Sequence, residues 1–101
     1  MEIITSLENK KIKNLSKLLI KKYRDEEGKF LVEGEHLVEE AYKAGVLLEV
    51  IKCDDYVREF DVNTTIVTYD VIKKLSYTQT PQKIIGVCKK IEEKEIGDKV
   101  L

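Results

Sequence analysis

The sequence is poor in the residues from which catalytic and metal sites are built. It contains a single histidine, His36, and two cysteines, Cys53 and Cys88, with no CxxC spacing. A zinc site takes four ligands that lie close together, so we expect no metal site in this chain. Both cysteines lie in or beside apolar runs, where a free thiol behaves as a small hydrophobic side chain. We therefore expect both thiols to be reduced and mostly buried.

Long apolar runs, signal sequences and nucleotide-binding fingerprints are also missing. No run approaches the roughly 18 apolar residues that a membrane-spanning helix needs, and the N-terminus lacks the basic head and apolar stretch of a secretory signal. These absences predict a cytoplasmic protein with no membrane partner. The chain has neither a GxGxxG fingerprint nor a P-loop. No serine or cysteine pairs with His36, which we expect to be a surface residue, so the sequence predicts no catalytic residue.

Charge is present in both signs but is unevenly distributed. The 101 residues include 18 basic and 19 acidic side chains, yet seven of the basic and only two of the acidic ones lie in residues 1–24. Such a split predicts a local electropositive face, which attracts phosphate groups even on a molecule that is nearly neutral overall. The length and the hydrophobic fraction of 43% predict one domain with a single core.

Hydrophobic periodicity predicts helices that alternate with strands. Apolar residues at three- and four-residue steps predict a first helix over residues 7–23, with Gly28 after it. Before it stands a capping box at Thr5 and Glu8, with Ser6 as a competing N-cap. Further helices are predicted over residues 35–44, 54–60 and 70–75, and strands over residues 30–33, 47–51, 65–68 and 84–88. The helix over residues 35–44 is predicted to end at Gly45, and its inner face is Leu37, Val38, Ala41 and Tyr42. The first strand is apolar at consecutive positions, which is typical of a strand covered on both faces. The alternation predicts an α/β sandwich with helices on both faces of a small, mixed, four-stranded sheet.

Basic residues recur along the first predicted helix. They step at three or four residues and are Lys10, Lys13, Lys17, Lys21 and Arg24. Such a series could line one strip that faces a phosphate backbone. A solvated amphipathic face gives the same pattern, and it is the commoner cause when the pattern stands alone.

Glu33 and Gly34 lie at a predicted strand-to-helix junction. A glycine there permits close backbone approach, and a helix N-terminus offers free N–H groups to an anion, although simple turn geometry explains the pair equally well. A polar loop that contains Thr80-Pro81-Gln82 precedes the last predicted strand, and its proline forces extended geometry on Thr80.

The order and spacing of these motifs resemble the start of the SpoU-type (TrmH-like) RNA ribose methyltransferases. The resemblance covers about residues 4–90, and the Thr80-Pro81-Gln82 loop is similar to the closing element of the same substrate-binding domain. Two residues depart from the pattern, because Lys83 stands where a glycine is usual and Gly86 where alanine is common. The residues that carry the resemblance are Ser6, Asn9, Ile12, Lys13, Leu15, Leu18, Lys21, Lys22, Arg24, Phe30, Val32, Glu33, Gly34, Val38, Glu40 and Ala41.

The resemblance implies a fold and a function for the chain. It implies a three-layer α/β/α sandwich similar to a small RNA-binding ribosomal protein, formed by residues 1–90. Residues 91–101 would then be a linker into a missing SPOUT domain that binds S-adenosylmethionine and methylates a ribose 2′-hydroxyl. The partner would be rRNA or tRNA, the parent enzyme would be a homodimer through the missing domain, and this chain alone would hold no cofactor. The implied RNA-binding residues are Lys10, Lys13, Lys17, Lys21, Arg24, Glu33, Gly34, His36, Thr80, Pro81 and Gln82.

Two other functions fit the residues. The chain could be a free-standing RNA-binding protein of the ribosomal type, or a protein-interaction or dimerisation module whose lysines are merely solvated.

The ribosomal-protein-like fold also carries a geometric expectation, in which the last strand runs antiparallel beside the first. Gly34 and the Thr80-Pro81-Gln82 loop would then share one edge of the sheet and offer donors to RNA backbone and exposed bases.

Overall fold

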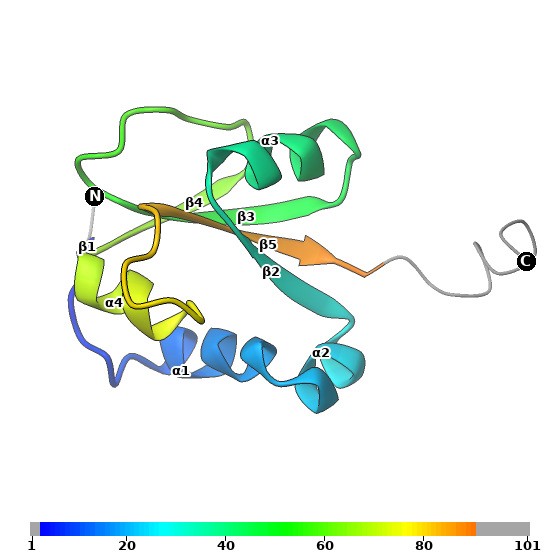
Figure 1. Ribbon diagram of the computed structural model, residues 1–101, viewed down its shortest axis with the longest axis horizontal. Coiled ribbons are helices and arrows are strands. Elements are labelled where there is room, and N and C mark those ends of the chain that lie inside the picture. The colour runs from blue at the N-terminus through cyan, green and yellow to red at the C-terminus, as the bar shows by residue number, and fades with distance from the viewer. Residues whose placement is uncertain (1–2, 91–101) are drawn as a thin grey trace, which may run out of the picture.

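A computed structural model of the chain describes residues 3–90, so the predicted linker over residues 91–101 lies outside the described residues. Figure 1 shows the arrangement of the elements. In chain order they are β1 (Ile3–Ile4), α1 (Lys10–Ser16), the 3₁₀ helix η1 (Lys17–Leu19), α2 (Lys21–Glu27), β2 (Lys29–Glu33), α3 (Glu35–Lys43), β3 (Leu47–Cys53), β4 (Asn63–Val67), α4 (Tyr69–Lys74) and β5 (Ile84–Lys89).

The strands form one five-stranded mixed sheet in the order β1-β4-β3-β5-β2. Strands β1, β4 and β3 are parallel to one another, whereas β5 runs antiparallel to both of its neighbours, β3 and β2. The mixed α/β class is therefore confirmed, with five strands instead of the predicted four. The missed strand, β1, is only two residues long and leaves no alternating pattern to recognise.

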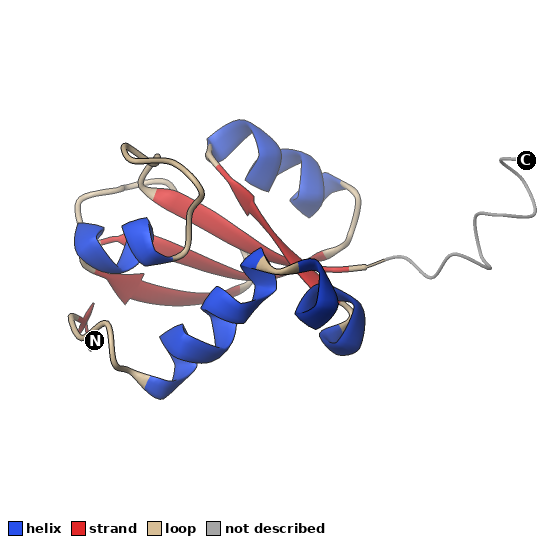
Figure 2. Cartoon of the chain, turned by 60° about the horizontal axis from the view of Figure 1, so that its bottom comes forward, coloured by secondary structure: helices blue, strands red, loops and turns tan. Residues whose placement is uncertain are grey.

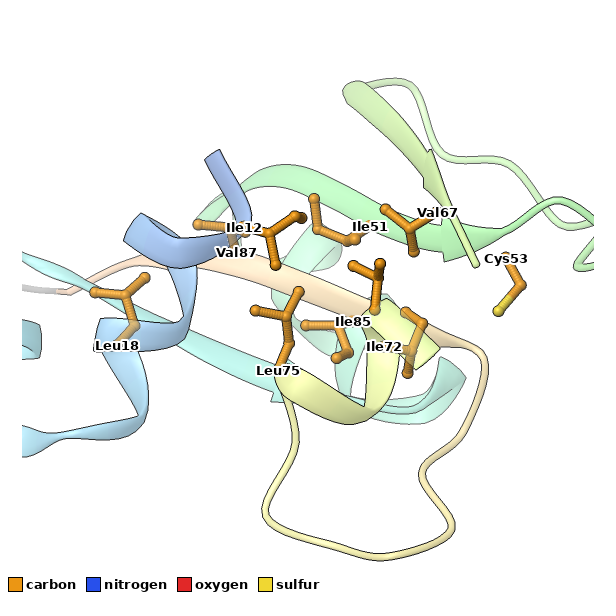
Figure 3. Close-up of a cluster of buried hydrophobic side chains, with 10 residues drawn as sticks. Ile12, Leu18, Ile51, Cys53, Val67, Ile72, Leu75, Ile85 and Val87 are labelled. Carbon is orange, nitrogen blue, oxygen red and sulfur yellow. The ribbon is translucent and has the colours of Figure 1, made fainter. Parts of the chain in front are cut away.

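Helices cover both faces of the sheet and produce two separate apolar layers. Helix α3 lies over one face, and α1, η1, α2 and α4 lie over the other (Figures 1 and 2). Successive side chains of β5 point alternately into the two apolar layers, because side chains alternate across a strand. Ile85 and Val87 pack with Ile12 and Leu75 beneath α1 and α4 (Figure 3), whereas Ile84 packs on the side of α3. This arrangement is the three-layer sandwich that the resemblance implied.

The first predicted helix is broken, so the prediction of one helix over residues 7–23 is wrong. Ile20 adopts an extended conformation (φ −110°, ψ 129°) between η1 and α2. The predicted capping box is also wrong, because Asn9 is the N-cap and its side chain accepts from the backbone N–H groups of Lys11 and Ile12. Gly28 ends α2 with a φ of 67°, as predicted.

The break at Ile20 is stabilised by two side chains, one from α2 and one from the loop before β5. A helix end leaves carbonyl oxygens without backbone donors. Here Arg24 Nη1 donates to the Leu18 carbonyl (3.0 Å), and the Tyr77 hydroxyl donates to the Leu19 carbonyl (2.6 Å). Local periodicity carries no information about such contacts, which is why the sequence predicted a continuous helix.

Two other predictions about the elements need correction. Residues 54–60 form no helix, since this segment is held in an irregular path by tertiary contacts of Tyr56 and Arg58 with Glu35 of α3. Strand β2 is half-buried along its whole length instead of covered on both faces, because it lies at the sheet edge with β5 as its one neighbouring strand.

Gly86 lies at the centre of β5 beneath α3. A Cβ atom at this position would lie 2.8 Å from Leu47 Cδ1 and 3.2 Å from Cγ2 of both Val32 and Val38. Side chains of the neighbouring strands and of α3 therefore occupy the space that an alanine would need.

Candidate nucleic-acid interface

Gly34 and the loop before β5 meet at one edge of the sheet, as expected. Strands β2 and β5 pair antiparallel with Glu33 opposite Ile85, and the Gly34 N–H donates to the Ile84 carbonyl (2.9 Å). A Cβ atom on Gly34 would lie 2.8 Å from Gln82 Nε2. The two segments, nearly fifty residues apart in sequence, are thus in contact, and the geometric expectation is confirmed.

Gly34 combines an unusual backbone with a helix N-terminus. Its φ of 99° and ψ of 152° place it in a region that is essentially restricted to glycine. No described side chain caps α3 at this residue. The first turn of α3 therefore directs N–H groups toward the same edge that carries the Gln82 side chain.

Glu33 holds the loop of residues 76–82 in place. One of its carboxylate oxygens accepts from the Ser76 hydroxyl, and the other accepts from the Gln82 N–H (2.9 Å). The Tyr69 hydroxyl donates to the Pro81 carbonyl (2.7 Å) as a further tie. Because both Glu33 oxygens already accept hydrogen bonds within the protein, the residue shapes this edge of the sheet.

Tyr77 connects this loop to the basic N-terminal segment. Besides donating to the Leu19 carbonyl, its hydroxyl accepts a hydrogen bond from Arg24 Nη1 (2.9 Å). Sequence reasoning missed Tyr77 as a site residue. The available signal was an aromatic side chain within an otherwise polar loop.

The predicted strip of basic residues does not form one continuous helix face, because the chain changes direction at Ile20. Lys10, Lys13 and Lys17 are exposed on α1 and η1, whereas Arg24 on α2 is half-buried and points its guanidinium at protein groups. Lys13 pairs with Glu8 (3.3 Å), and Lys21 pairs with Asp25 (2.8 Å). Within residues 3–90, Lys10 and Lys17 have no carboxylate partner.

The surface between α1 and α2 carries both signs of charge. A hollow of 670 Å³ lies there, and its charged lining residues are Lys10, Lys11, Lys17, Lys29, Glu26, Glu27 and Glu49. Lys11 is paired with Glu49 (2.7 Å). The electropositive face predicted from the charge distribution is therefore narrow, and it is centred on the unpaired lysines Lys10 and Lys17.

Arg58 and Lys43 offset the charge of the acidic residues near the N-terminus of α3. Arg58 pairs with Glu35 (2.6 Å) and with Glu39 (3.3 Å), while the Tyr56 hydroxyl also donates to Glu35. Hydrogen bonds from Tyr56 and then Arg58 hold the pKa of the Glu35 carboxyl below its ordinary value. Burial and the Glu35 contact raise the pKa of Tyr56 to about 12. These contacts offset negative charge beside Gly34.

The remaining predicted site residues differ in exposure, which decides whether each can contact a ligand. His36 is exposed in the first turn of α3, as expected, and Thr80 and Gln82 are exposed in the loop. Pro81 is buried, so it contributes to the shape of the loop. Lys83, which stands where the family pattern has a glycine, pairs with Asp55 on the surface. Each partner of that pair shifts the pKa of the other, raising that of Lys83 and lowering that of Asp55.

Neither cysteine is placed for reactivity. Cys53 and Cys88 are free and buried, as predicted, and burial raises the pKa of the Cys88 thiol to about 11. Across residues 3–90, no three histidine, cysteine, aspartate or glutamate side chains gather in a way that could hold a metal ion. The described helices include none that is long and apolar enough to cross a membrane.

Comparison with known proteins identifies the family. A family model described as the MRM3-like substrate binding domain matches residues 9–86, most of the chain. The chain belongs to this family. Its membership confirms the resemblance to SpoU-type methyltransferases that the motifs indicated.

Relatives of this MRM3-like domain include RNA methyltransferases. The chain is 41% identical to the 23S rRNA (guanosine(2553)-2′-O)-methyltransferase RlmP of Bacillus subtilis, an alignment that covers 93% of this chain and 40% of that protein. A crystal structure of an RNA 2′-O ribose methyltransferase matches with a TM-score of 0.81 at 30% identity, covering 90% of this chain and 38% of that one. An AdoMet-bound rRNA methyltransferase from Sinorhizobium meliloti gives a TM-score of 0.73 at 26% identity, covering 89% and 37% of the two chains. The MRM3-like domain thus spans about 40% of the length of these relatives.

Proposed function

We propose that the chain is the RNA-recognition domain of an S-adenosylmethionine-dependent RNA 2′-O-ribose methyltransferase. Residues 1–90 bind the RNA substrate, and residues 91–101 link them to the domain that transfers the methyl group. The observation that carries the proposal is the meeting of Gly34 with the Thr80-Pro81-Gln82 loop. Membership in the MRM3-like family and the names of the relatives support it.

Each predicted site residue takes a role that suits its surroundings. The RNA backbone is attracted by the basic residues of the N-terminal segment, which are Lys10, Lys13, Lys17, Lys21 and Arg24. Lys10 and Lys17 make the direct phosphate contacts. The N–H groups in the first turn of α3 and the side chains of His36, Thr80 and Gln82 contact backbone and exposed bases. Glu33 and Pro81 hold the loop in the conformation that presents these groups.

The whole enzyme supplies the remaining functions. Its C-terminal domain binds S-adenosylmethionine, carries the catalytic residues, forms the homodimer and methylates rRNA or tRNA in the cytoplasm. The recognition domain contributes no group to methyl transfer. Its function is to raise the local concentration of the correct RNA and to set the orientation of the target ribose.

Binding of the chain to ribosomal RNA and to tRNA at several salt concentrations tests the proposal. Affinity should fall steeply as salt rises, since lysine contacts release counterions from the phosphates. Lys10→Glu and Lys17→Glu should each lower affinity for many RNA sequences alike, while Lys43→Glu at the far end of α3 serves as the charge-matched control. Gln82→Ala should weaken binding, and Gln79→Ala, an exposed glutamine of the same loop, should not.

The outcome of these measurements separates the competing functions. Salt-insensitive self-association without RNA affinity would favour the protein-interaction module and overturn the proposal. RNA binding that Lys10→Glu, Lys17→Glu and Gln82→Ala all leave unchanged would place the interface elsewhere on the domain.

A further inference from the structure

Tyr77 has an exposed ring and an engaged hydroxyl. Its relative exposure is 74%, one of the highest among the large hydrophobic side chains of residues 3–90. The hydroxyl nevertheless donates to the Leu19 carbonyl (2.6 Å) and accepts from Arg24 Nη1 (2.9 Å). A tyrosine without partners rotates on the surface, whereas this ring is held in one position by contacts from η1 and α2. A ligand that covers the faces of this ring therefore causes little further loss of side-chain entropy.

The surface around the ring is hollowed and largely apolar. One hollow of 220 Å³ includes Leu18 and Phe30 in its lining, and a second of 160 Å³ includes Leu37. Tyr77 lines both hollows, so it stands between them. Leu37 is 49% exposed although it lies in the first turn of α3, next to the Gly34 edge. A flat apolar ligand can thus cover the Tyr77 ring and still contact neighbouring side chains.

The charges around Tyr77 favour contact with a base over contact with a phosphate at this position. Glu33 lines the second hollow, and its carboxylate repels a phosphate group placed there. Arg24 instead lines the first hollow, where its Nη1 also donates to the Tyr77 hydroxyl. A nucleotide that places its phosphate toward Arg24 and its base over Tyr77 avoids the repulsion. An unpaired base therefore fits the position better than a phosphate does.

We infer that Tyr77 is a stacking platform for one unpaired base of the RNA substrate, an inference that rests on the proposed function. The base stacks on the Tyr77 ring, beside Leu37, while an adjoining phosphate lies toward Arg24. Aromatic stacking of this kind tolerates any base, because every base has a π face. Tyr77 thus selects single-stranded over paired RNA at this position and leaves the base identity open.

A pair of synthetic RNAs tests the inference on the full chain. One is a short stem-loop whose loop contains an unpaired adenine, and the other is the same stem-loop with an abasic site in its place. Tyr77→Ala should lower affinity for the first RNA by roughly tenfold or more, the effect of losing one stacked base, and should leave affinity for the abasic RNA nearly unchanged. Tyr42→Ala, a second exposed tyrosine on α3, should change neither affinity. Tyr77→Phe should retain most of the binding because the ring remains.

A spectroscopic readout distinguishes stacking from a change in the loop. The chain contains no tryptophan, so Tyr77→Trp introduces a single indole at the site. Its emission should fall on addition of the stem-loop and much less on addition of the abasic RNA. Unchanged emission at saturation, or equal losses of affinity in Tyr77→Ala and Tyr77→Phe, would overturn the inference while RNA recognition itself stands. If the wild-type chain binds neither RNA, the proposed function fails first.

Discussion

Gly34→Ala should destabilise the domain through its backbone conformation. The φ of 99° and ψ of 152° lie in a region that alanine adopts only at a cost of roughly 1–3 kcal/mol. The added Cβ would also meet the Gln82 side chain at 2.8 Å, but that side chain is exposed and can rotate away. The loss of unfolding free energy should therefore be about 2 kcal/mol, nearly all of it from backbone strain.

Gly28→Ala provides the matched comparison. Gly28 also has a positive φ, 67°, but it lies in the left-handed helical region, and a Cβ atom added there would meet no other atom within 4 Å. Its replacement should cost about 1 kcal/mol, because the strain of that region is partly offset by the lower entropy of the unfolded chain.

Urea denaturation followed by circular dichroism measures both losses. The double variant Gly34→Ala with Gln82→Ala should recover only a few tenths of a kcal/mol, since the contact with Gln82 is the minor contribution. Full recovery in the double variant would mean that steric contact dominates. Equal losses at positions 34 and 28 would refute the argument from the backbone conformation.

Two further predictions concern the N-terminal segment. Asn9→Ala should lower the unfolding free energy by about 1 kcal/mol through loss of the α1 cap, whereas Thr5→Ala should change it little; thermal unfolding of both variants decides between the two caps. Hydrogen bonds from its two lysine partners, Lys21 and Lys90, lower the pKa of Asp25 from 3.8 to about 2. The stabilisation is present above pH 3.8 and is lost as the pH falls toward 2, so Asp25→Asn should flatten the acid dependence of the unfolding midpoint in that window. An unchanged acid profile would show that these ion pairs are too well solvated to matter.

Local sequence patterns predicted those elements that depend on contacts between residues close together in the sequence. Helix α3 ends before Gly45, which has a φ of 77°, and Val38 and Ala41 are buried as its periodicity indicated. The same stripe also predicted Leu37 and Tyr42 as inner residues, yet both are more than 40% exposed. Helix α3 packs on β2, β3 and β5, and it buries a narrower face there than its apolar residues suggest.

The candidate site was predictable where the family pattern supplied the topology. The proximity of Gly34 and Gln82 follows once β5 is known to pair antiparallel with β2, and that pairing came from the resemblance. The role of Glu33 as a tie to Ser76 and Gln82 could not be predicted, because it depends on side-chain geometry across the loop. Tyr77 was missed for the same reason, since its partners lie more than fifty residues away in sequence.

Gly86 has a consequence for how this sequence can diverge from its relatives. The position where the family pattern commonly has alanine is occupied here by glycine, and Leu47 Cδ1 fills the space of the missing methyl group. The side-chain sizes at positions 47 and 86 therefore depend on each other across β3 and β5. Alanine at 86 is compatible with this core only when the side chain at 47 is shortened or turned aside. In an alignment of the family, a larger residue at one of these positions should accompany a smaller residue at the other.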